Sequence, residues 1–167
     1  MPVAIRPSDE GLAAEPFHYV VACQPAHERL RAVLTQLAGL SLMTMLGRET
    51  TFDRETPLRL VRASLSETEE MLAGLPVPPR AAHHHHHVSE ACRALARACD
   101  LASGDPITRN TEPAKRDLSR QLRLAADHLR FAGRALPGFE MVDLTQSCCA
   151  AHASAALQAE NATELQF

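Results

Sequence analysis

A line of apolar residues recurs at three- and four-residue steps between positions 118 and 136, and this spacing is the period of one face of an α-helix. Its members are Leu118, Leu122, Ala125, Leu129, Ala132 and Leu136. Asn110 or Thr111 can cap the start of this helix, while Pro137 and Gly138 end it. A segment with this pattern must bury its leucines against other elements, so it predicts a helix inside a larger helical assembly.

Four more segments follow the same period, and short connectors rich in proline and glycine separate them. These segments are about 26–46, 56–74, 81–103 and 140–163. Thr56 before Pro57 matches a helix N-cap followed by a proline in the first turn. Alanine and leucine dominate the apolar residues, whereas the β-branched and aromatic residues that favour strands are scarce. We therefore expect an all-α protein, an up-and-down helical bundle of four to five helices.

Pro2, Pro7, Pro16 and Pro25 interrupt the first 25 residues, and each removes a backbone donor. The sequence therefore predicts an irregular N-terminal arm over 1–25, in which only 17–23 is ordered, as a short strand or a docked extended segment. The remaining residues, 26–167, are expected to form a single helical-bundle domain, since domains of this size are common.

The formal charge of −3 gives no global attraction to nucleic acid or to an anionic membrane, so we expect neither as a partner. The uncharged stretch 32–47 is interrupted by polar residues and is shorter than the ~20 residues that span a bilayer. Nothing in the first residues resembles a secretory signal, and the five cysteines are an odd number, so we expect a cytoplasmic protein with reduced thiols.

Five consecutive histidines open the third expected helix at 83–87. Successive residues of a helix point ~100° apart, so five neighbours cannot converge on one ion. Measured from the buried line of this helix, two point inward, one lies on the flank and two face solvent. These are His84 and His85, then His87, then His83 and His86.

Two pairs within this run have the spacing of a chelating site for zinc, nickel or copper: His83 with His87 at i, i+4, and His84 with His87 at i, i+3. Because His87 belongs to both pairs, its replacement should weaken metal binding more than replacement of His85 or His86. The alternatives are a partly solvated first turn and an engineered tag, although tags usually lie at a terminus.

Cys148 and His152 lie one helical turn apart on the alanine-rich face of the last expected helix, a spacing that suits zinc or copper. If His84 points inward, it can meet them. The competing interpretation is that Cys148 packs in the core, as Cys92 and Cys99 are expected to do.

The fourth expected helix also carries a basic stripe opposite its leucines, which consists of Arg116, Arg120, Arg123, Arg130 and Arg134. A solvated outer face explains this pattern, and an acidic protein partner is the functional alternative. His128, on the flank of the same helix, is expected to be a hydrogen-bonded structural residue.

Three functions follow from these features. The first is a non-enzymatic bundle that acts through protein–protein interaction as a homodimer, because helix one is apolar on much of its circumference. The second is a divalent-metal-binding bundle that uses the histidine-rich start of helix three. The third is an enzyme with a metal or thiol site in the bundle core, but the sequence contains no nucleophile elbow, dinucleotide fingerprint or phosphate loop and so leans against it.

Overall fold

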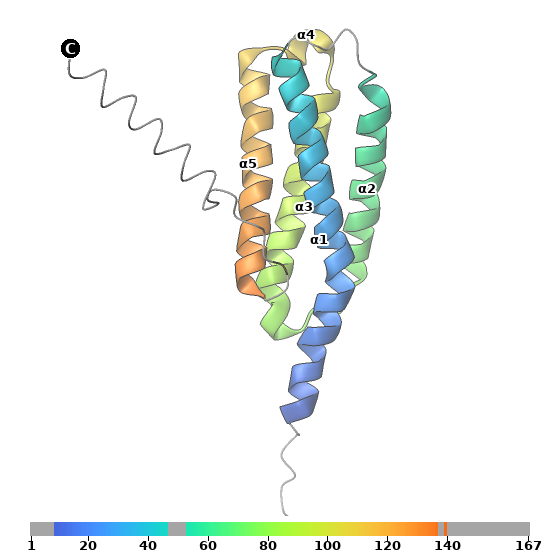
Figure 1. Cartoon of the computed structure of the whole chain (residues 1–167), viewed down its shortest axis with the longest axis vertical. Coiled ribbons are helices and arrows are strands. Elements are labelled where there is room, and N and C mark those ends of the chain that lie inside the picture. The colour runs from blue at the N-terminus through green and yellow to red at the C-terminus, as the bar shows by residue number, and fades with distance from the viewer. Residues whose placement is uncertain (1–8, 47–52, 137–138, 140–167) are drawn as a thin grey trace, which may run out of the picture.

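Four long helices pack side by side in a computed structural model, which describes residues 9–46, 53–136 and 139. They are α1 (Asp9–Met45), α2 (Glu55–Gly74), α3 (Ala82–Ser103) and α5 (Glu112–Ala135). A 3-10 turn, η2 (Pro79–Ala81), precedes α3, and a four-residue helix, α4 (Pro106–Arg109), precedes α5. Successive long helices run in opposite directions (Figure 1), and the described residues contain no strand, so the predicted up-and-down bundle is confirmed.

The prediction of an irregular arm over 1–25 is wrong from Asp9 onward, because α1 begins there and contains both Pro16 and Pro25. The extended segment expected at 17–23 is likewise helical. An interior proline costs a helix about 3 kcal/mol. Here the face that carries Tyr19 and Cys23 continues into the buried line of α1, and the apolar area buried along that line offsets the lost hydrogen bonds.

The caps of the later helices agree with the sequence in part. Thr111 caps α5 as predicted, and its side chain accepts from the amide of Ala114 at 3.4 Å. α2 begins one residue before Thr56, and the carboxylate of Asp53 accepts from the amides of Glu55 and Thr56 instead. α4 was not expected; the side chain of Asp105 caps it.

The core is built from leucines and small residues, and the most extensive helix contact joins α3 and α5. Alanines supply much of the buried surface of these two helices, and small side chains allow helix axes to approach closely. These alanines are Ala91, Ala94, Ala98, Ala102, Ala125 and Ala132. The pairing of α3 with α5 therefore fixes the start of α3 against the end of α5.

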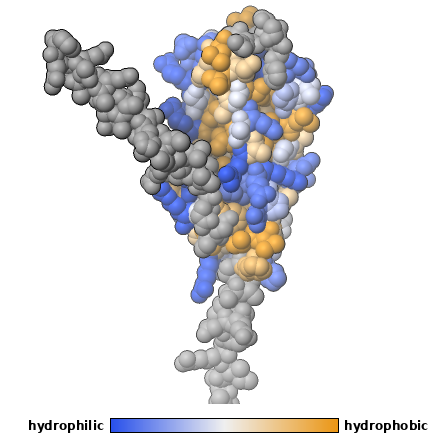
Figure 2. All heavy atoms as spheres, viewed as in Figure 1, coloured by the Kyte–Doolittle hydropathy of each residue, from blue (hydrophilic) through white to orange (hydrophobic). Residues whose placement is uncertain are grey.

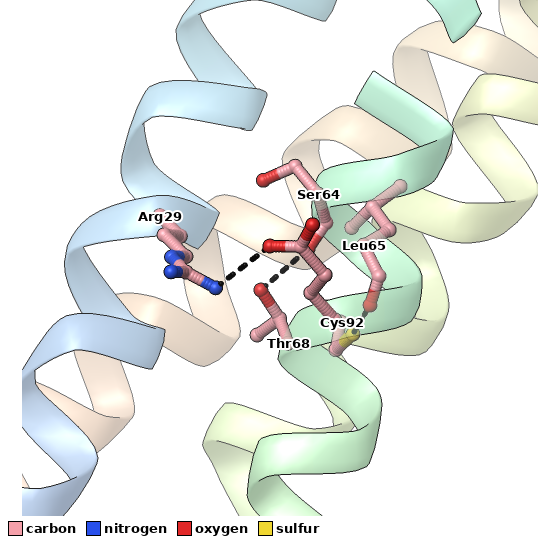
Figure 3. A network of polar contacts seen from close by, with 6 residues as sticks. Arg29, Ser64, Leu65, Thr68 and Cys92 are labelled. Carbon is pink, nitrogen blue, oxygen red and sulfur yellow. Dashed lines mark hydrogen bonds and ion pairs between the residues drawn. The ribbon is translucent and has the colours of Figure 1, made fainter. Parts of the chain in front are cut away.

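The contacts of α2 differ on its two sides (Figure 3). Arg29 of α1 pairs with Glu67 of α2 at 3.2 Å, and both side chains are largely exposed. Toward α3, the thiol of the buried Cys92 lies 3.8 Å from the carbonyl oxygen of Leu65. Exposed ion pairs contribute little to stability, so burial holds α2 in place.

Some apolar residues stay outside the core. Figure 2 shows hydrophobic side chains exposed toward both ends of one face of the bundle. At the end of α1 these are Leu42, Met45 and Leu46, and near its start they are Phe17 and Val21.

No helix among the described residues has the length and apolar character needed to cross a bilayer.

Candidate functional site: a histidine cluster at one end of the bundle

The histidine run lies at the end of the bundle where α3 begins and α5 ends, beside the first half of α1 (Figure 1). The side chains point as helical geometry predicts: His84 is fully buried, His85 and His87 are half-buried, and His83 and His86 are exposed. The cluster is thus divided into an inner part that faces α1 and an outer part that faces α5.

The inner part centres on His84. Its Nδ1 atom lies 2.9 Å from the hydroxyl oxygen of Tyr19, which is also 3.4 Å from Nδ1 of His85. Its Nε2 atom has no hydrogen-bond partner among the described residues. Burial, followed by the neighbouring His27, His85 and His87, lowers the pKa of His84 to about 4. His84 is therefore neutral at physiological pH.

His27 of α1 repeats this environment. It is buried, its pKa is lowered chiefly by burial, and its Nε2 atom is likewise without a partner in the described part of the chain. The ring of Phe139 covers both histidines, with centroid distances of 5.1 Å to His27 and 4.2 Å to His84. This aromatic contact ties the chain beyond α5 to α1 and α3.

The outer part is a chain of three imidazoles in which His87 is the central member. Its Nε2 atom lies 3.3 Å from Nε2 of His83, and its Nδ1 atom lies 2.9 Å from Nδ1 of His128 on α5. Burial, followed by the neighbouring His83, His128 and His86, lowers the pKa of His87. A neutral imidazole has one N–H and one bare nitrogen, so His87 donates from one ring atom and accepts at the other.

The separation between His83 and His87 fits joint coordination of one ion. Two nitrogens bound to zinc at about 2.0–2.1 Å in a tetrahedral arrangement are separated by about 3.3 Å. His128 cannot share that ion, because it meets the opposite ring nitrogen of His87. It can instead accept the Nδ1–H that metal binding at Nε2 imposes on His87, the outer-shell contact that orients metal-bound histidines.

No group of three or more His, Cys, Asp or Glu side chains within residues 9–46, 53–136 and 139 is arranged to hold one ion. Of the predicted metal ligands, the structure brings His83 and His87 together. His84 is directed to Tyr19 instead, so the predicted pair of His84 with His87 is not formed. Cys148 and His152 lie outside the described residues, and their contact with His84 stays a prediction.

Two members of the cluster were not predicted to join it. His128 was expected to be hydrogen-bonded, as it is, but its partner on α3 was not foreseen. Its position on the flank of α5, near the end that meets the start of α3, was the available signal. Tyr19 was assigned to an irregular arm, so nothing placed it beside His84.

The cysteines within the described residues do not form a reactive site. Cys92 and Cys99 are buried, as expected, and each thiol lies 3.8 Å from a carbonyl oxygen of α2. Burial raises the pKa of Cys92 to about 11 and also raises the pKa values of Cys23 and Cys99. These residues stay protonated near neutral pH and are poor nucleophiles.

The five arginines of the predicted basic stripe are all exposed on α5. Arg120 pairs with Asp117 at 3.1 Å and Arg130 with Asp127 at 3.0 Å. This is the arrangement of a solvated outer face, and an acidic partner at this stripe stays a prediction.

Comparison with protein-family models, with curated proteins and with solved structures finds no match to this chain.

Proposed function

We propose that this helical bundle binds a divalent transition-metal ion, such as zinc, nickel or copper, through the Nε2 atoms of His83 and His87. The observation that carries the proposal is the 3.3 Å separation of these two atoms on consecutive turns of α3. The lowered pKa of His87 supports it, because a metal ligand must be unprotonated. The hydrogen bond from His87 to His128 supports it as well, since it fixes the orientation of the ring.

Two protein ligands leave the other coordination positions open. Structural zinc sites are closed by four protein ligands, whereas open sites exchange their ion or accept another ligand. The site therefore suits reversible binding, as in metal storage, delivery or sensing, better than a purely structural role.

Calorimetric titration of zinc and nickel into untagged protein tests the proposal. The wild type should bind, and His83→Ala or His87→Ala should abolish binding or weaken it strongly. His86→Ala removes an exposed histidine from the same run, and His18→Ala removes an exposed histidine of α1, so both serve as matched controls. Binding that is equally weakened by all four substitutions, or no binding by the wild type, would refute the proposal.

A second candidate function, interaction as a homodimer, is favoured by the exposed apolar residues at the end of α1. Leu42, Met45 and Leu46 keep 56%, 53% and 62% of their surface exposed, and monomers rarely leave neighbouring apolar residues uncovered. Light scattering on the metal-free protein tests this candidate. A monomer mass at micromolar concentration would exclude it under those conditions.

A further inference from the structure

The pair formed by His83 and His87 is half of a zinc site, and this inference rests on the metal binding proposed above. Zinc is almost always four-coordinate when proteins hold it firmly. The described residues offer no third ligand to the ion. His83 is exposed and His87 is half-buried, so the open side of the pair faces outward, where another molecule can approach.

The surface beside the pair is apolar. Leu124 and Phe131 lie on the same flank of α5 as His128, one turn before it and one turn after it. They leave 39% and 46% of their surface exposed, and the ring of Phe131 lies 5.3 Å from that of His87. Association at this face would therefore remove apolar surface from water together with the histidines.

The charges that border this surface are already compensated. Asp127 pairs with Arg130 at 3.0 Å on α5, and Glu90 pairs with Arg93 on α3. A second copy of the chain can approach the same face without bringing unpaired like charges together. A face that binds itself about a two-fold axis is the commonest interface of homodimers.

We propose that one zinc ion joins two copies of this chain, with His83 and His87 of each copy supplying two of the four ligands. The two-fold axis passes through the ion, and Leu124 and Phe131 of the two copies flank it. His128 of each copy stays behind the metal-bound His87 and accepts its Nδ1–H. The resulting dimer is separate from any dimer formed at the end of α1, because it requires metal.

Titration of zinc into metal-free protein, followed by light scattering, tests the bridge. The mass should double relative to the metal-free protein as zinc approaches one ion per two chains. It should fall again when zinc exceeds one ion per chain, because each copy then holds its own ion. A chelator should restore the starting mass.

Three variants sharpen the test. His83→Ala should abolish the doubling. Leu124→Lys places two like charges across the interface, so it should reduce the doubling while calorimetry still detects zinc. Leu60→Lys, at an equally accessible leucine on α2, is the matched control and should leave the doubling unchanged.

The outcomes separate the two proposals. Zinc binding at one ion per chain with no change of mass would overturn the bridge and leave the metal site standing; ligands from Cys148 or His152 of the same chain would give this result. Doubling that persists in His83→Ala would also overturn the bridge. Absence of any zinc binding would overturn both.

Discussion

The hydroxyl oxygen of Tyr19 and the Nδ1 atom of His84 lie 2.9 Å apart in the interior of the bundle, and 65 positions of sequence separate the two residues. Tyr19 is 2% exposed and His84 is fully buried. Each therefore supplies a polar partner where water is excluded. The contact joins α1 to α3 and explains why the inner face of the histidine run packs as core.

Replacement of Tyr19 by phenylalanine should lower the free energy of unfolding by about 1–3 kcal/mol, because it leaves a buried ring nitrogen of His84 unpaired. Urea denaturation followed by circular dichroism measures the change. His18→Ala, at the exposed neighbouring position, should stay within about 0.5 kcal/mol of the wild type. If the two variants were equally stable, the hydrogen bond would contribute nothing.

The protein should lose stability as the pH falls below 6.5. The folded state holds the pKa of His84 at about 4 and also lowers that of His27, whereas both histidines titrate near 6.5 in the unfolded chain. Between these values the unfolded state binds protons that the folded state excludes, so acid favours unfolding. Above pH 6.5 both histidines are neutral in both states, and their contribution is fully present.

Urea unfolding measured from pH 6.5 down to about 4 tests this dependence, whose slope is at most about 1.4 kcal/mol per pH unit for each histidine. His27→Leu removes one of the two groups, so the stability of this variant relative to the wild type should rise as the pH falls. A constant difference between the two proteins across this range would contradict the prediction.

His128 should control metal affinity without touching the metal. His128→Ala removes the acceptor for Nδ1–H of His87 and should weaken zinc binding by about 10–100-fold. His128→Asn should retain most of the affinity, because its side-chain oxygen can occupy the place of Nδ1. Calorimetry distinguishes the variants, and equal affinities for His128→Ala and the wild type would show that the ring of His87 needs no such support.

The leucine line of α5 should carry much of the stability. Leu129 is fully buried, so Leu129→Ala should cost about 2–5 kcal/mol through lost burial and the cavity that remains. Leu60→Ala on the exposed side of α2 is the control and should change stability by no more than about 0.5 kcal/mol. Denaturant midpoints of the two variants should therefore differ clearly.

Local sequence patterns were sufficient for the helices that begin and end with clear signals. The leucine spacing of α5, its cap at Thr111 and the orientation of each histidine in 83–87 follow from helical geometry alone. α1 was predicted only from residue 26, because proline propensity was weighed without the burial of Tyr19 and Cys23 that outweighs it.

The candidate site was only half predictable, and the limit is physical. His83 and His87 are one turn apart on one helix, so their proximity depends on local structure that spacing reveals. The contacts of His87 with His128 and of His84 with Tyr19 depend on how α3 packs against α5 and α1. Periodicity identifies which face of each helix is buried, but it does not say which residues of two packed helices lie at the same height.

The chain contains one tyrosine and no tryptophan, and that tyrosine is Tyr19. Its ring lies edge-on to those of His84 and His85, with centroid distances of 5.6 Å and 6.1 Å. The intrinsic tyrosine emission of the whole protein thus originates at a single place, beside the histidines. Protonation of His84, a loosening of α1 from α3, or an ion bound nearby would each alter the surroundings of this one fluorophore, and the native chain reports on them without a label.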